Sequence, residues 1–249
     1  MINKIKYNRA IFIPDIHVPF QDDDAIRAII AFARWWKPKT SFYMGDVVDF
    51  YAVSHFLRDP ERKSKLQNEI DQTVQVMDRI NQALGKSEKY LLRGNHEARL
   101  QKYLWAKAEE IAGLRSLKIE KLLDLERMNV EYIPDGRTNF HGIIVKHGDI
   151  VRKFSGFTGK GEFESSGMSG VSVHTHRLAL YRQTNEAGNF VWMECGCLCH
   201  LGAEYLDGKI PNWQEGFGIG YFKEGSNHYH LETVPIVDGR AVYGGYEFY

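Results

Sequence analysis

The sequence has no excess of either charge and no long hydrophobic run. Lysine plus arginine and aspartate plus glutamate number 32 each, so the formal net charge is +0. Without a basic excess the chain lacks the global field that drives sequence-independent DNA binding, and nucleic acid can be bound only through a local patch. The apolar stretches are too short for a signal peptide or a membrane-spanning helix. We therefore expect a cytoplasmic protein that binds no membrane and needs no obligatory protein partner.

Cysteine is also scarce, and its three residues are Cys195, Cys197 and Cys199. An odd number of cysteines points to a reducing compartment. A strand would place the three thiols in a row on one face, with neighbouring thiols too far apart for comfortable disulfide geometry. Buried structural thiols are the favoured interpretation. The alternative is a thiolate metal site, which would need a fourth ligand such as His200 and a turn in place of the strand.

Apolar residues, by contrast, are abundant. They make up 43% of the 249 residues, with 13% aromatic, which is ample for one sizeable core. No linker rich in proline, glycine and serine divides the chain, and no internal repeat is present. We therefore expect one domain that spans residues 1–249.

Hydrophobic patterning predicts an α/β first half and a mostly β second half. The expected first-half elements, in chain order, are a strand at 10–13, a helix at 22–36, a strand at 41–44, a helix at 64–84 and a strand at 90–92. This alternation is typical of a parallel sheet with helices on its faces. The expected later strands are 140–146, 178–184, 190–195, 217–222 and 229–234, with helices confined to 97–125 and part of 160–170. Two packed sheets are the better interpretation of this change.

Polar clusters follow three of the predicted strands. They are Asp15-Ile16-His17, Gly45-Asp46-Val47-Val48-Asp49 and Gly94-Asn95-His96-Glu97. The carboxyl ends of parallel strands lie along one edge of a sheet, where α/β proteins bind ligands. The later half adds His147, directly after an apolar run, and the pair His174 and His176.

These clusters hold more candidate metal ligands than one ion needs. The seven candidates are Asp15, His17, Asp46, Asn95, His147, His174 and His176. Carboxylate, imidazole and amide oxygen together suit Mn²⁺, Fe or Zn²⁺. Two ions that share a bridging carboxylate can use seven ligands, and ions roughly 3.5–4 Å apart act on the attacking and leaving oxygens in phosphoryl displacement.

Several other polar or aromatic residues have a simpler structural explanation. The acidic run 22–24 is explained by helix capping and the helix dipole. Trp213 and Phe217 are interpreted as packing residues, and 156–161 as a mobile, mildly basic loop near His147. Histidines outside the ordered clusters are expected to be satisfied core residues, namely His55, His141, His200, His228 and His230.

The ordered blocks resemble the calcineurin-like metallophosphoesterase superfamily. DIH, GDVVD, GNHE, VKHGD and VHTH match, in order and approximate spacing, D-x-H, G-D-x-x-D, G-N-H-[DE], a lone His and G-H-x-H, except that Val173 stands where the last pattern has Gly. The match spans about residues 11–176. It implies a four-layered α/β/β/α sandwich of two mixed β-sheets flanked by helices. Residues 195–249 lie outside the shared motifs and look similar to stand-alone phosphoesterases of bacteria and their phages.

The resemblance also implies roles for the matching residues. Asp15, His17 and His176 would bind one metal ion, and Asn95, His147 and His174 the other. Asp46 would bridge the two ions, which would be Mn²⁺, with Fe, Zn²⁺, Mg²⁺ or Ni²⁺ as alternatives. A metal-bound hydroxide would be the nucleophile. His96 would lie beside the ions without binding them and donate a proton or a hydrogen bond, and Asp49 would hold its imidazole.

The substrate is less well specified by the sequence. Arg93 either contacts a substrate phosphate or forms a salt bridge at the sheet end. Phe50 and Tyr51 follow GDVVD, where packing is favoured over a stacking platform for a base. We expect a nuclease or phosphodiesterase acting on a nucleotide or nucleic-acid phosphodiester or end. The alternatives are a phosphomonoesterase or phosphoprotein phosphatase, and, in another class, a non-catalytic metal-binding scaffold.

Overall fold

The structure is a computed structural model that describes residues 7–55, 65–202 and 211–249. Its larger sheet has eight strands in the order β13-β12-β11-β10-β1-β2-β3-β4. The first four strands of the chain, β1 to β4, run parallel to one another, and β10 pairs with β1 in the antiparallel direction. The strands of this sheet are β1 (Tyr7–Ile13), β2 (Thr40–Tyr43), β3 (Glu88–Leu92), β4 (Val130–Ile133), β10 (Gly216–Lys223), β11 (Tyr229–Val237), β12 (Arg240–Tyr243) and β13 (Tyr246–Phe248).

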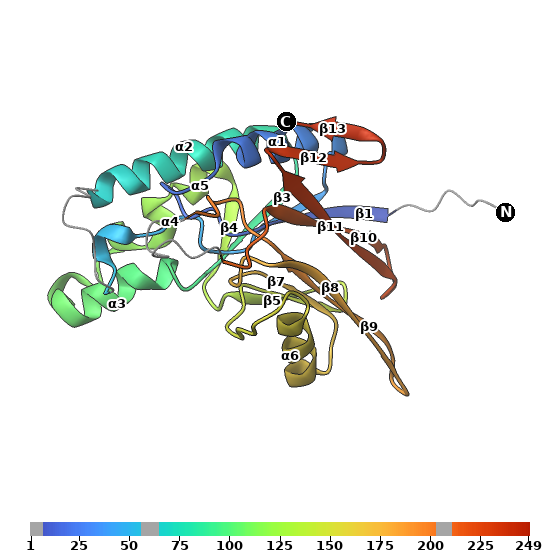
Figure 1. The fold of residues 1–249 in the computed structure, drawn as a ribbon. Helices are drawn as coiled ribbons and strands as arrows, with labels where there is room; N and C mark the ends of the chain where they lie inside the picture. The colour runs from blue at the N-terminus through green and yellow to red at the C-terminus, as the bar shows by residue number, and fades with distance from the viewer. Residues whose placement is uncertain (1–6, 56–64, 203–210) are drawn as a thin grey trace.

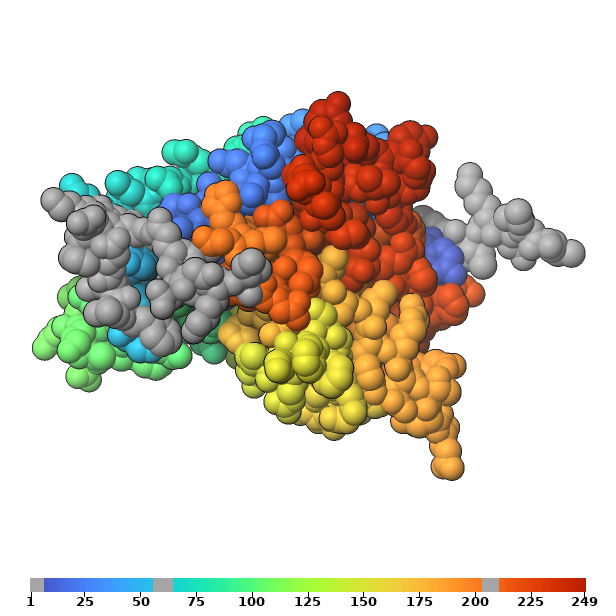
Figure 2. Space-filling model, in the orientation of Figure 1, coloured from blue at the N-terminus to red at the C-terminus, as the bar shows by residue number. Residues whose placement is uncertain are grey.

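The smaller sheet has five strands in the order β5-β6-β7-β9-β8. β7 pairs in parallel with β6 and with β9, whereas the outer pairs are antiparallel. The strands are β5 (Arg137–Phe140), β6 (Ile143–Lys146), β7 (Gly170–Ser172), β8 (Leu178–Asn185) and β9 (Gly188–Cys195). The β8–β9 hairpin projects from the body of the molecule at the lower right of Figures 1 and 2.

Helices cover the outer faces of both sheets (Figure 1). The α-helices are α1 (Asp23–Trp36), α2 (Leu66–Leu84), α3 (Glu97–Lys107), α4 (Ile119–Leu122), α5 (Leu125–Met128) and α6 (Phe157–Ser166). Short 3₁₀ helices are η1 (Tyr51–Val53), η2 (Glu109–Ile111) and η3 (Arg115–Leu117). With α1 and α2 on the larger sheet and α6 on the smaller one, the layers are α/β/β/α, so the expected fold class is confirmed. None of the helices in the described ranges could span a membrane.

Two hydrophobic clusters hold the layers together. Between the sheets, Phe12 and Phe42 stack with their ring centroids 5.5 Å apart, and Val145 and Met193 of the smaller sheet belong to the same cluster. Under α1, Phe32 packs against Phe217 of β10 at 4.8 Å. Each fully buried ring of this kind stabilises the fold by roughly 1.5–3 kcal/mol. The packing role expected for Phe217 is therefore confirmed.

The predicted helices and strands are found, with one change in continuity. The helices expected within 97–125 are α3, which ends at Lys107 because Ala108 leaves the helical region at φ −155°, followed by η2, η3 and α4. The strand expected at 140–146 is a hairpin, because His141 and Gly142 form a turn with φ of 47° and 83°. Such left-handed pairs match the twist of two-residue hairpin loops. Ser64, the expected start of the second helix, lies outside the described residues.

The segment 156–161 is not a free loop. Gly156, at φ 82°, is the N-cap of α6. The carboxylate of Glu194 accepts hydrogen bonds from the backbone nitrogens of Gly156 and Gly159, both at 2.9 Å. A buried acid at a helix N-terminus satisfies free N–H groups and the dipole. Asp22 caps α1 in the same way, accepting from Asp24 and Ala25, which confirms the capping interpretation of that acidic run.

The histidines expected in the core are wrong for most of the set. The exposed members are His55, His200, His228 and His230, and His141 is half-buried. They lie at sheet edges and loops, where partners are available: His200 lies 3.1 Å from the carboxylate of Asp22, and His230 lies 2.7 Å from that of Glu232.

Candidate metal centre

The first two polar clusters are joined by backbone hydrogen bonds at the carboxyl ends of β1 and β2. The amides of Ile16 and His17 both donate to the carbonyl oxygen of Asp46, at 3.0 and 2.9 Å. Asp15 receives the amide of Leu198 at 2.7 Å, which brings the chain beyond β9 to the same place. The sheet edge therefore gathers segments far apart in sequence.

One group of ligand atoms comes from Asp15, His17 and His176. Nε2 of His176 lies 3.0 Å from Oδ2 of Asp15 and 3.0 Å from Nε2 of His17. Oδ1 of Asp15 is buried and accepts no hydrogen bond from any residue in the described ranges. Two facing imidazole nitrogens and an unsatisfied carboxylate oxygen are a donor set that a divalent cation fits.

A second group comes from Asp46, His147 and His174. Nε2 of His147 lies 3.3 Å from Oδ2 of Asp46 and 3.0 Å from Oδ1 of Asn95. Nδ1 of His147 donates to the carbonyl oxygen of Met44 at 2.9 Å. That bond fixes the tautomer and leaves Nε2 able to bind a cation, as in ligating histidines generally.

Asp46 lies between the two groups. Its Oδ2 is 3.9 Å from Nε2 of His17 and 3.3 Å from Nε2 of His147. Burial raises the pKa of Asp46, but the imidazoles of His147 and His96 outweigh burial and hold that pKa well below its usual range. The carboxylate is therefore ionised at neutral pH, as a metal ligand must be.

His96 has both ring nitrogens in contact with other groups. Nδ1 lies 3.0 Å from the carbonyl oxygen and 3.1 Å from Oδ2 of Asp49, and Nε2 lies 2.9 Å from Nη2 of Arg99. Nη1 of Arg99 also donates to the Asp49 carbonyl and carboxylate, at 2.9 and 3.1 Å. His96 also forms, with His17 and Asp46, a third group that could hold a cation. Arg99 is not among the site residues expected from the sequence, although its spacing of three residues from His96 at the start of α3 was a signal.

Glu97 is a second residue of the site that the sequence motifs did not assign to a role. It is buried, and its carboxylate accepts from the backbone nitrogens of Asp46, Val47 and Gly94 at 2.8, 2.9 and 2.8 Å. Burial and the charge of Asp46 raise the pKa of Glu97 to about 7. One carboxylate therefore connects the loop after β2 with the loop after β3.

The motif glycines are required by close approach. A Cβ on Gly94 would lie 2.1 Å from Oδ1 of Asp46, and one on Gly45 would lie 2.8 Å from Nδ1 of His147. No side chain fits at either position.

Four candidate ligands have left-handed backbone conformations. The φ angles are 53° for His17, 52° for Asp46, 72° for His174 and 56° for His176. Non-glycine residues in this region carry a cost of order 1–3 kcal/mol each, and such strain clusters at functional sites. The surrounding hydrogen bonds hold the ligands in place against that cost.

Comparison with known proteins identifies the family. Residues 9–215 match the calcineurin-like phosphoesterase family. The chain belongs to this family. It is a metal-dependent phosphoesterase, a hydrolase.

The phosphoesterase has similar proteins in phages. The Gene 54 protein of Mycobacterium phage D29 is 28% identical over 250 residues, covering 96% of this chain and 97% of the phage protein. The Gene 54 protein of Mycobacterium phage L5 is 27% identical over 244 residues, covering 93% and 95%. Among solved structures, Vacuolar Protein Sorting 29 from Cryptosporidium parvum aligns with 14% identity and a TM-score of 0.49, covering 97% of this chain and 98% of that chain.

The expected substrate contacts of the phosphoesterase differ in accessibility. Phe50 is fully buried in the core, so its ring has no face open to a base, and packing is the correct alternative. Tyr51 is half-buried, with its ring edge-on to Phe20 at 6.0 Å. Arg93 is exposed and forms no ion pair with any residue that the structure describes. It lines a cleft of about 510 Å³ that also contains Asn95 and His147.

The cysteines of the phosphoesterase are all buried and free. Only Cys195 lies on β9, so the expected row of three on one strand is wrong. His200 is exposed and close to Asp22, so it is no fourth ligand for the thiols. The imidazole nearest to them is His176, which sequence spacing gave no reason to choose.

Proposed function

We propose that the phosphoesterase hydrolyses phosphate esters with two divalent metal ions. Asp15, His17 and His176 would hold one ion, and Asn95, His147 and His174 the other. The observation that supports this is the place of Asp46, whose Oδ2 lies within 3.9 Å of His17 and 3.3 Å of His147, where both ions could share it.

Mn²⁺ is the proposed metal. The donor atoms are carboxylate and amide oxygens with imidazole nitrogens, a mixed set that suits Mn²⁺ and also accepts Fe, Zn²⁺, Mg²⁺ or Ni²⁺. When bound, two such ions neutralise phosphoryl oxygens and bring the pKa of a water nucleophile from about 15.7 towards about 7.

His96 would supply the proton for the leaving oxygen. The carboxylate of Asp49 accepts a hydrogen bond from Nδ1 of His96. This contact keeps the Nε2 edge of the ring turned towards Arg99 and Asp46. Because the guanidinium of Arg99 donates to Nε2, that nitrogen can deliver a proton only after Arg99 exchanges this contact for one with a substrate oxygen. Arginine suits this exchange because its fork matches paired phosphate oxygens.

The cleft beside Asn95 and His147 supports a nucleotide or nucleic-acid phosphodiester as substrate. Arg93, Lys102, Arg137 and Lys146 line it together with Asp135 and Asp149, so the cleft has a small positive excess on a chain with no net charge. Trp105 lines the same cleft and is 61% exposed, so its ring is open to a base. Aromatic stacking on bases contributes about 1–3 kcal/mol per base in single-strand binding.

A screen with added Mn²⁺ tests this function. The substrates are bis-para-nitrophenyl phosphate, 2′,3′-cyclic nucleotides, single-stranded DNA and the monoester para-nitrophenyl phosphate. We expect diester hydrolysis that a chelator abolishes and that His96→Ala lowers by on the order of 10² or more. His230→Ala, at an exposed histidine of β11, is the matched control.

Other outcomes identify the alternatives. Hydrolysis of the monoester alone would favour a phosphomonoesterase or phosphoprotein phosphatase. Metal binding without hydrolysis of any substrate would favour a non-catalytic scaffold. Three free cysteines fit a reducing compartment, so we also propose a cytoplasmic location.

A further inference from the structure

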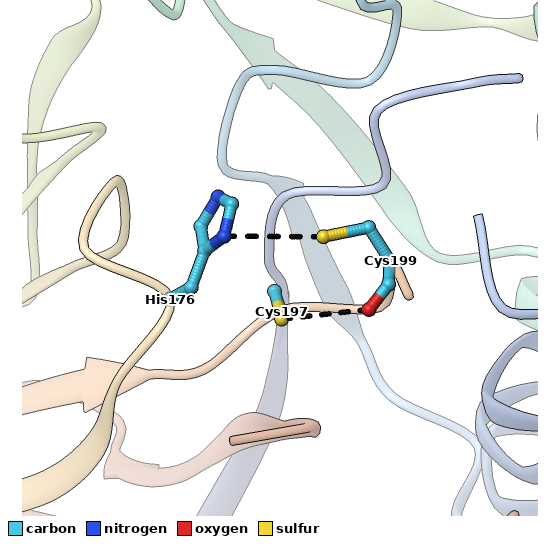
Figure 3. Close-up of side chains that lie close together, drawn as sticks. All are labelled: His176, Cys197 and Cys199. Carbon is cyan, nitrogen blue, oxygen red and sulfur yellow. Dashed lines mark hydrogen bonds between the residues drawn. The ribbon is translucent and has the colours of Figure 1, made fainter. Parts of the chain in front are cut away.

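Two cysteines and a histidine form a separate cluster behind the proposed dinuclear centre. Nδ1 of His176, Sγ of Cys197 and Sγ of Cys199 all lie within 4.8 Å of one another. Figure 3 shows the Nδ1 edge of the imidazole turned to the sulfur of Cys199, at 3.9 Å. All three residues are buried, with exposed fractions of 6%, 0% and 3%. The cluster is therefore inside the protein, with three donor atoms near enough to one another to hold one ion.

The donor atoms differ in kind from those of the dinuclear centre. That centre offers carboxylate, amide and imidazole donors, whereas this cluster offers two sulfurs and one nitrogen. Thiolate with imidazole selects Zn²⁺ and similar thiophilic ions and is a poor choice for Mn²⁺ or Mg²⁺. Bond lengths of about 2.3 Å to sulfur and 2.0–2.1 Å to nitrogen put the donors of a tetrahedral ion roughly 3.5–3.8 Å apart. Nδ1 of His176 and Sγ of Cys199, 3.9 Å apart, are already close to this spacing, and the other donor pairs lie within 4.8 Å.

We propose that His176, Cys197 and Cys199 form a binding site for a thiophilic divalent cation of the Zn²⁺ class. The site is distinct from the oxygen and nitrogen centre but shares one imidazole with it, since Nε2 of His176 faces Asp15 at 3.0 Å. Three protein ligands leave a fourth position open. The carbonyl oxygen of Gln214, 3.7 Å from Sγ of Cys197, is an oxygen donor beside the cluster.

The backbone holds this cluster in place. Cys197 bridges to both Asp15 and Glu215, which places the sulfurs beside the first metal loop. The amide of Gln214 donates to the carbonyl oxygen of His176 at 2.8 Å, and the amide of Cys197 donates to that of Gln214 at 3.1 Å. These backbone contacts hold the three ligand residues in place before an ion binds.

Binding at this site releases protons. A divalent ion M²⁺ that reacts with two thiols gives M(SR)₂ and two protons, and Nδ1 of His176 must be deprotonated to bind. When Nε2 also binds an ion, the ring loses its last proton and bridges the two centres. A thiophilic ion would then change the affinity of the hydrolytic centre for Mn²⁺. This consequence rests on the proposed function, whereas the existence of the site does not.

Titration of the full-length protein with Cd²⁺ tests the site. Sulfur bound to cadmium gives a charge-transfer absorption in the short-wavelength ultraviolet, seen as a difference spectrum, that oxygen and nitrogen ligands do not give. We expect this band in the wild-type protein, its loss in the C197S/C199S variant and its retention in Cys195→Ala. Cys195 is the matched control because its thiol is buried but lies outside the cluster.

Several results would overturn the proposal. They are a wild-type protein that binds Mn²⁺ but gives no band with Cd²⁺, a band that persists in the double variant, and a band lost in Cys195→Ala. If the double variant fails to fold by circular dichroism, Cys199→Ser alone is compared with the wild type, and an unchanged cadmium content per chain refutes the site. A band without Mn²⁺-dependent hydrolysis would refute the proposed function and leave this site intact.

Discussion

Nε2 of His147 faces Oδ2 of Asp46 at 3.3 Å while Nδ1 of the same ring donates to a backbone carbonyl at 2.9 Å. Burial lowers the pKa of His147, but the charges of Asp46 and Asp15 outweigh burial and raise that pKa to about 10. Without a bound cation, the ring is therefore protonated on both nitrogens at pH 7–8, and a cation that binds Nε2 must displace the proton there.

Metal binding should accordingly release protons. We expect the apparent affinity for Mn²⁺ to rise with pH between 6 and 9, because fewer imidazoles remain to be deprotonated. Calorimetric titrations in buffers of different ionisation enthalpy measure the release, and heats that do not depend on the buffer would contradict it. Without a bound cation, the raised pKa of His147 also stabilises the folded state. This stabilisation is complete at pH values below about 6.5, the pKa of histidine in the unfolded chain, and it is lost as the pH rises through about 10.

Gly94→Ala should damage the metal centre. The added Cβ would lie 2.1 Å from Oδ1 of Asp46, so the loop after β3 must shift. Overpacking of this kind costs about 1–3 kcal/mol, and the displaced Asn95 should weaken metal binding at least tenfold. Gly113→Ala is the control, because nothing lies within 4 Å of its Cβ. Equal unfolding midpoints in urea for the two variants would contradict the close approach.

Glu97→Gln should separate the two loops that this carboxylate connects. The amide replaces one acceptor oxygen with an NH₂ group that faces backbone donors of Asp46, Val47 or Gly94. A buried donor left without an acceptor costs about 1–3 kcal/mol. Urea unfolding measures the loss, and Glu88→Gln, at an exposed position, should be neutral. A variant as stable as the wild type would exclude this role for Glu97.

Arg99→Gln should move the pH profile of hydrolysis. Burial lowers the pKa of His96, Asp46 and Asp49 raise it by more, and the charge of Arg99 opposes the rise. Removing that charge raises the pKa further, so an acid at His96 stays protonated to higher pH and the alkaline limb of the kcat profile shifts upward. Arg79→Gln, whose side chain is 46% exposed, should leave the limb in place. If KM changes but the alkaline limb of the kcat profile does not shift, Arg99 acts in substrate binding and does not set the pKa of His96.

Trp105→Ala should weaken binding only of substrates that carry a base. Loss of one stacking contact, about 1–3 kcal/mol, predicts a rise in KM of about tenfold for a cyclic nucleotide. The KM for bis-para-nitrophenyl phosphate is the internal control, and Trp105→Phe should retain most of the binding. Equal increases for both substrates would argue against base recognition at this position.

Local sequence patterns predicted the strand ends that carry Asp15, Asp46 and Asn95. This was possible because apolar runs that stop at proline or glycine are local signals, and because parallel strands necessarily bring their carboxyl ends to one edge. The layered fold followed from the change of pattern near residue 130 and from the ordered motifs. These features depend on neighbours along the chain.

The side chains that support those ligands were determined by contacts between segments far apart in the sequence. Arg99 contacts Asp49 across 50 residues, and His176 contacts Cys199 across 23, distances that no local pattern encodes. The burial of Phe50 and the exposure of His200 likewise depend on what packs above each residue. Side-chain contacts of this kind arise from the close packing of distant segments, because only that packing determines which polar atoms lose water and must find each other.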